Sequence, residues 1–205
     1  MATLSKTQNT DLVAFAEVAS TAVTVGTAVD VSTKAAAQVL VWFGRCAATA
    51  LTQPFEWRIE TSIASSGDTP GLWVPFASAG SNVAAAADEA VSGTCSSGQK
   101  VIGMASTTGF STTPQNAGQM IFIRNSTPTN SEWARVNLLT SNTSVTVEEN
   151  LVNAQTGSTV YGDAQFWSVY VPLDGVGRIR GVANNSATGQ TVAFRMAMVT
   201  FDSIG

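Results

Sequence analysis

Residues 55–63 read Phe-Glu-Trp-Arg-Ile-Glu-Thr-Ser-Ile, and this stretch decides the fold class. Its side chains alternate between two faces. One face is expected to carry Phe55, Trp57, Ile59, Thr61 and Ile63, and the other Glu56, Arg58, Glu60 and Ser62. Successive side chains of a β-strand point to opposite faces, which makes a period of two the signature of a half-buried strand. We therefore expect a strand here with one face in a core and one face in water.

The same alternation recurs along much of the chain. It is found in residues 120–124, 145–147, 166–173 and 192–198, while the apolar run at 39–43 predicts a strand buried on both faces. Turn signals separate these segments at intervals of about ten residues, which favours an antiparallel sandwich or barrel. The best helical candidate is the alanine-rich segment 84–91, which is short and could equally lead into a strand, and residues 32–37 could form one helical turn.

Composition excludes several classes of function. The chain of 205 residues has no histidine, 12% charged residues and a net charge of −4. We therefore expect no His-dependent catalytic site or zinc site and no basic surface for nucleic acid, and hence no enzyme, cofactor or metal. A calcium site built from scattered oxygen ligands stays open, because spacing does not reveal such sites.

Membrane and secretion signals are also missing from the sequence. The longest strongly apolar run, 39–43, is far shorter than the roughly 20 residues that span a bilayer, and residues 1–6 lack the apolar stretch of a signal peptide. We therefore expect synthesis in a cytoplasm and no membrane partner. Cys46 and Cys95 are expected to be buried free thiols.

The predicted strands divide the chain into a discontinuous sandwich and an inserted unit. Residues 11–92 together with 163–205 are expected to form the β-sandwich, and 93–162 a small β-barrel, since barrel closure removes exposed sheet edges. One continuous sandwich with long hairpins is the alternative. Residues 1–10 are polar and lack periodicity, so we expect a flexible arm that either docks on a neighbouring subunit or frays.

The middle of the chain carries a resemblance to a known family. Residues 101–110 read VIGMASTTGF, 121–123 read IFI, 130–136 read NSEWARV and 144–147 read SVTV. This series resembles a small β-barrel module of tailed-bacteriophage structural proteins, and the flanking segments resemble the sandwich of capsid decoration, or cement, proteins. The resemblance covers about two thirds of the chain. It implies a protein that binds the outside of a capsid shell, often as a trimer, with no catalytic residues to transfer.

Three groups of residues are candidates for contact with a partner. They are Leu4 and Lys6 in the arm, Trp73 and Trp133, and the arginines Arg135, Arg178 and Arg180. Trp133 shares its face with polar residues, so it either meets a partner or packs on a seam between the two units. Arg178 and Arg180 share one face of a strand and could pair with Glu56 and Glu60, which share a face of another, or simply be solvated. The other strand tryptophans, at 42, 57 and 167, are expected in the core.

These features predict a virion structural protein on the capsid exterior. Its expected partners are the major capsid protein and further copies of itself, with a trimer favoured, and it has no small-molecule substrate. The alternative is a phage tail or baseplate β-protein that binds a host glycan, which would require a groove with exposed aromatic side chains. A carboxylate-dependent virion hydrolase is disfavoured, because no carboxylate pair stands out in the sequence.

Overall fold

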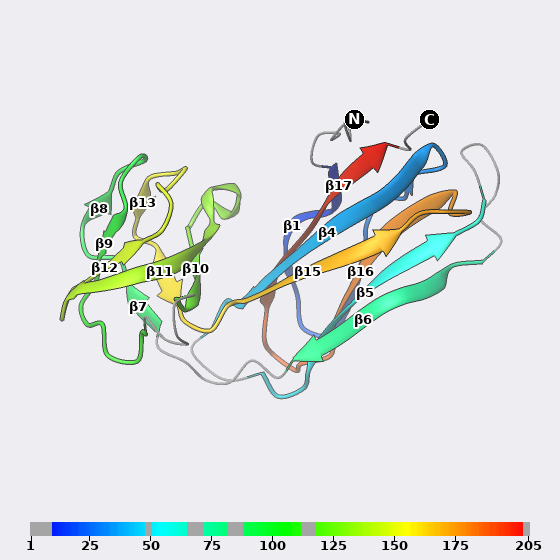
Figure 1. The fold of residues 1–205 in the computed structure, drawn as a ribbon. Helices are drawn as coiled ribbons and strands as arrows, with labels where there is room; N and C mark the ends of the chain where they lie inside the picture. Colours follow the sequence, from blue (N-terminus) through cyan, green and yellow to red (C-terminus); the bar gives the residue numbers. More distant parts are fainter. Residues whose placement is uncertain (1–9, 48–50, 65–71, 82–87, 112–117, 203–205) are drawn as a thin grey trace, which may run out of the picture.

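The computed structural model describes residues 10–47, 51–64, 72–81, 88–111 and 118–202, and these form an antiparallel all-β protein (Figure 1). This confirms the predicted fold class. The strands belong to two units, a long sandwich and a smaller curled sheet at one end of it (Figure 1). The only helical element in the described part is a short 3-10 turn, η1 (Pro128–Asn130).

Two antiparallel sheets make up the sandwich. One has the order β1 (Thr10–Val18), β17 (Val192–Asp202), β4 (Lys34–Arg45) and β15 (Gln165–Pro172). The other has the order β2 (Ala22–Val25), β16 (Arg178–Asn185), β5 (Phe55–Ser62) and β6 (Val74–Ser81), with β3 (Val29–Asp30) also paired to β16.

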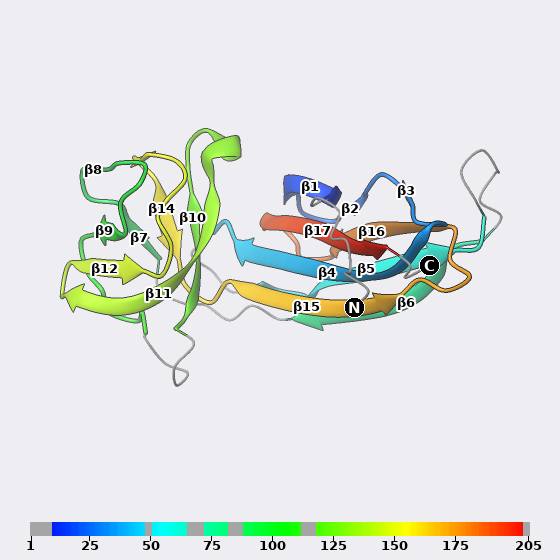
Figure 2. The same ribbon diagram turned by 45° about the horizontal axis from the view of Figure 1, so that its top comes forward.

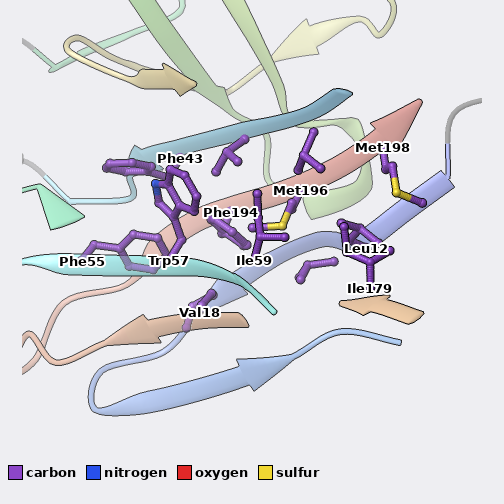
Figure 3. Packing of buried hydrophobic residues seen from close by; sticks show 14 of the residues in the cluster. Leu12, Val18, Phe43, Phe55, Trp57, Ile59, Ile179, Phe194, Met196 and Met198 are labelled. Carbon is purple, nitrogen blue, oxygen red and sulfur yellow. The ribbon is translucent and has the colours of Figure 1, made fainter. Parts of the chain in front are cut away.

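Alternating apolar residues of both sheets meet in one core, which Figure 3 shows from close by. Phe55, Trp57 and Ile59 of β5 face Phe43 and Phe194 of the opposite sheet, as the alternation predicts. Rings of Phe55 and Phe194 lie 5.3 Å apart, and rings of Phe43 and Phe55 lie 5.1 Å apart. Each such side chain contributes roughly 1.5–3 kcal/mol when it leaves water, so this layer holds the two sheets together.

The smaller unit is a six-stranded sheet with its own core. Its order is β7 (Asp88–Ala90), β14 (Thr159–Tyr161), β10 (Met120–Arg124), β11 (Glu132–Ser141), β12 (Ser144–Val147) and β9 (Val101–Gly103). A bridge between Val91 and Met104, which directly follow the two outermost strands, joins the ends of the sheet and curls it into a barrel. Ile102, Ile121 and Val145 fill the interior.

A short two-stranded sheet of β8 (Thr94–Cys95) and β13 (Gln155–Thr156) adjoins the barrel. β7 lies before residue 93, where the sequence places the start of the inserted unit, yet it pairs with β14 of the barrel sheet. Cys46 and Cys95 are buried free thiols, as expected.

Neither candidate helical segment forms a helix where the structure describes it, and of the two readings left open for 84–91 the strand is the one observed. Residues 88–90 form β7, because their backbone groups find partners in β14, and 84–87 lie outside the described residues. Residues 32 and 33 form a turn, after which β4 begins at Lys34. Short alanine-rich segments carry too little intrinsic helical stability to compete with a ladder of sheet hydrogen bonds.

The expectation that residues 39–43 are buried on both faces is also wrong. Val39, Val41 and Phe43 are fully buried, whereas Leu40 and Trp42 are only half-buried on the outer face of the sheet. Trp42 therefore does not join the sandwich core with Trp57 and Trp167. Its ring packs instead against that of Phe166 on β15, 5.4 Å away.

Candidate interaction surfaces

The two units meet in a seam of aromatic side chains. Trp133 of the barrel packs against Phe15 of β1, with ring centroids 5.6 Å apart, and against Phe122 of β10 at 5.0 Å. This is the seam packing that the sequence left as one of two readings for Trp133. The polar residues beside Trp133 on β11 are compatible with this packing, because a residue at a seam can be covered by the other unit while its strand neighbours stay in water.

A bidentate ion pair crosses the same seam. Arg124 of β10 donates through Nε and Nη2 to the two carboxylate oxygens of Glu17 in β1, both at 2.7 Å. These hydrogen bonds to Glu17 raise the pKa of Arg124. The Nη1 group of Arg124 also donates to the carbonyl oxygen of Cys46 at 3.3 Å, and the Tyr161 hydroxyl donates to the same oxygen at 3.2 Å.

The thiol of Cys46 is buried in the same seam. Burial, and then the nearby Glu17 charge, raise the pKa of Cys46 to about 12.

Gly44 of β4 allows the barrel to lie close to the sandwich. A Cβ atom on Gly44 would lie 2.7 Å from the Cβ of Phe122, closer than two carbon atoms can pack. The barrel thus rests directly on the backbone of β4. Together with the aromatic contacts and the ion pair, this fixes the barrel against the end of the sandwich.

The opposite end of the sandwich exposes an apolar patch. Ile63 directly follows β5, Leu72 precedes β6, and Val74 and Phe76 lie within β6, with exposed fractions of 87%, 71%, 50% and 43%. We call these four residues the end patch. β6 is the edge strand of its sheet, so both its side chains and one side of its backbone are available. Exposed large apolar side chains gathered at one end of a sheet are typical of sites that contact other proteins.

Trp73 lies between Leu72 and Val74 of the end patch in the sequence, and its ring contacts Arg180. The Arg180 guanidinium lies 4.2 Å from the centre of the Trp73 ring, and its Nε donates to Glu60 at 2.7 Å. Glu60 also accepts from Nε of Arg58 at 2.5 Å. The expected cross-strand pairing of Arg180 with Glu60 is therefore present. Glu56 instead accepts from Asn184 at 3.3 Å.

Glu60 is a buried carboxylate that remains charged. Burial alone would raise its pKa, but the hydrogen bonds and charges of Arg180 and Arg58 outweigh it and hold the pKa below its usual value. Arg178, two residues before Arg180, lies opposite Ser62 of β5 and Asp30 of β3. Trp73, Arg178 and Arg180 thus gather at one end of the five-stranded sheet.

The other candidates lie elsewhere. Arg135 is on the barrel, where its Nε lies 3.5 Å from a carboxylate oxygen of Glu148. Leu4 and Lys6 fall outside the described residues. Since the barrel and the start of β6 are at opposite ends of the molecule (Figure 1), the five candidates that the structure describes do not share one surface.

A cleft of about 380 Å³ follows the junction of the two units. It is lined from the sandwich by Phe15, Trp42 and Arg195, and from the barrel by Thr129, Ser131, Glu132, Trp133, Val152 and Asn153. Sequence reasoning missed this cleft because Trp42 lies in an apolar run that resembles core, and because its two walls come from segments far apart in the chain.

No protein-family model and no curated protein matches this chain. Within the described residues, no group of three or more His, Cys, Asp or Glu side chains is placed to hold a metal ion. The same part of the chain has no helix with the length and apolar character needed to cross a bilayer.

Proposed function

We propose that this chain is a virion structural protein that binds the outer surface of a phage capsid and stabilises the shell as a cement protein. The observation that carries the proposal is the end patch, an exposed apolar surface on a chain that is only 12% charged. Exposed charge keeps free proteins apart, whereas a surface covered by neighbours needs little of it. The resemblance of residues 101–147 to a phage structural module supports the same role.

The two-unit architecture suits a protein under mechanical load. The seam joins barrel and sandwich through packed rings, the Glu17–Arg124 ion pair and the close contact at Gly44. These contacts provide a path along which a force applied at one end would be carried to the other. Many copies on a symmetric shell, as trimers in our proposal, stabilise it by mass action even when each contact is modest.

The proposal is tested by adding the purified protein to capsid shells that lack it. We expect co-sedimentation with the shells and a higher temperature of shell disruption. The double variant Leu72→Ser with Phe76→Ser should bind at least about tenfold more weakly, because each large apolar side chain contributes roughly 1.5–3 kcal/mol when buried.

A matched control removes two exposed apolar residues from the barrel instead. Val101→Ser with Leu138→Ser deletes a comparable apolar area far from the end patch and should bind as the unchanged protein does. Shells that never take up the protein would overturn the proposal. Equal weakening by both double variants would show that the end patch is not the contact.

The second candidate function is a tail or baseplate protein that binds a host glycan. It is favoured by one observation, the cleft at the junction of the two units, which presents the aromatic side chains that such a site needs. Protein found on tails and absent from heads would favour this candidate over the first.

A further inference from the structure

We infer that the cleft between the sandwich and the barrel is a binding site for an uncharged pyranose unit of a glycan. This inference does not depend on shell binding through the end patch, which lies at the other end of the sandwich (Figure 1). It rests on the aromatic lining of the cleft, on how its charges are paired, and on the two rigid units that form its walls.

Aromatic rings line the cleft from both units. Trp42 is half-buried on the outer face of β4, beside the seam rings of Phe15 and Trp133. Trp42 has Arg195 of β17 and Phe166 of β15 as its cross-strand neighbours, with the guanidinium 5.8 Å and the phenyl ring 5.4 Å from the centre of its ring. A pyranose presents flat patches of C–H groups that pack well on such a ring, which offers a large apolar area at little cost in side-chain entropy.

The charged groups of the cleft are already paired with other groups of the protein. Arg195 contacts Asp11 Oδ1 through Nε and Nη2, both at 3.0 Å. Glu132 accepts from the backbone amides of Val152 at 3.0 Å and Asn153 at 3.3 Å, and from Nε2 of Gln155 at 2.7 Å. Asp11 neutralises Arg195, whereas the three donors to Glu132 are uncharged and leave its negative charge in the lining, so the cleft disfavours an anionic ligand.

The same pairing fixes these groups in place. Asp11 orients the Arg195 guanidinium and three donors orient the Glu132 carboxylate, so their remaining hydrogen-bonding capacity points in set directions. Hydroxyl groups both donate and accept, which lets one sugar ring use an arginine and a carboxylate at once. Groups held in place before binding lose less entropy when the ligand arrives.

The size and position of the cleft fit a small ligand. A volume of about 380 Å³ lies within the range of about 300–1,000 Å³ found for small-molecule sites, which often form between domains. Figure 2 shows the barrel against the end of β4 and β17, the two strands that carry Trp42 and Arg195. Because each unit supplies one wall, the site is complete only while the seam holds.

The whole protein is screened on an array of neutral hexose and N-acetylhexosamine oligosaccharides, and calorimetry then measures the affinity for each oligosaccharide that binds. We expect at least one neutral oligosaccharide to bind. Trp42→Ala should weaken that binding at least tenfold, while Trp42→Phe should restore part of it. Tyr170→Ala is the matched control, since Tyr170 is an exposed aromatic residue of the neighbouring strand β15 and does not line the cleft; it should bind unchanged.

Several outcomes would overturn the inference. They are the absence of binding to every neutral oligosaccharide at millimolar concentration, binding of acidic glycans or of proline-rich peptides alone, and binding that Trp42→Ala leaves intact. Circular dichroism and thermal melts establish that each variant is folded. Shell binding by Trp42→Ala should match that of the unchanged protein, so that failure of this inference and failure of the cement proposal are separate results.

Discussion

Arg124 of the barrel donates two hydrogen bonds to the carboxylate of Glu17 in the sandwich, each 2.7 Å long. The two residues are 107 positions apart in sequence and belong to different sheets, so this ion pair links the two units directly. Bidentate pairs of this type are both stronger and more directional than single contacts. The seam is therefore a defined interface that mutation can probe.

We expect Glu17→Gln to lower the free energy of unfolding by about 1–2 kcal/mol, since hydrogen bonds to charged groups contribute about 1.5–3 kcal/mol and Arg124 is partly exposed. The control is Glu148→Gln, which removes a longer and more exposed contact to Arg135 and should cost no more than about 0.5 kcal/mol. Chemical denaturation measures both. Equal losses of unfolding free energy in the two variants would mean that the seam ion pair contributes no more to stability than the exposed pair does.

Gly44→Val should destabilise the protein by about 1–3 kcal/mol, because the added side chain overlaps Phe122 and pushes the barrel away. Limited proteolysis should then cut between the units faster. Gly80→Ala is the control, since its Cβ would come no closer than 3.3 Å to Glu56 Cγ and 3.5 Å to the Phe55 carbonyl oxygen, and we expect a change of about 0.5 kcal/mol or less. A Gly44→Val protein as stable as the control would contradict the close contact.

Local alternation along the chain predicted a large part of the fold. The core-facing side of residues 55–59 and 192–198 and the strands of the middle segment follow from a period of two, whereas Ile63, expected on the core side, is 87% exposed, and Glu60, expected in water, is buried. These features depend on which side of a strand a residue occupies, and the sequence reports that directly.

The candidate sites were less predictable because they depend on how separate segments meet. Nothing near Trp42 indicates that the outer face of its sheet is left partly open, and nothing near Gly44 indicates that Phe122 will rest on it. Trp73 and Arg180 were each singled out, but their stacking follows only from the neighbouring positions of β16, β5 and β6. Periodicity carries no information on such placement.

Acid should weaken the sandwich through Glu60. Its pKa is lower in the folded protein than in the unfolded chain, so its ionised form adds stability that is fully present above the unfolded value of about 4.3 and is lost as pH falls through the folded value. Glu60→Gln should be less stable at pH 7 and should lose less on going to pH 3. Identical pH profiles for the two proteins would exclude this role.

Between about pH 6 and 8 we expect little change in stability or attachment, because the chain has no histidine to titrate there. Melting temperatures and shell occupancy across this range provide the measurement. A sharp loss of either within the window would require a titrating group that we have not identified.

Both thiols should be unreactive in the folded protein. Burial raises the pKa of Cys46 to about 12 and also raises that of Cys95, so neither thiolate forms at neutral pH. A thiol reagent such as dithionitrobenzoate should label neither residue in buffer and both in denaturant. Rapid labelling of the native protein would show that the seam around Cys46 opens.

We propose that this protein lies on the outside of a capsid with its end patch against the shell. A cryo-electron microscopy map of the virion that carries it would show this placement. We predict density for the sandwich and barrel on the outer surface of the head, with Leu72 and Phe76 facing the shell. Density on the tail or baseplate alone, with the head surface bare, would contradict the account.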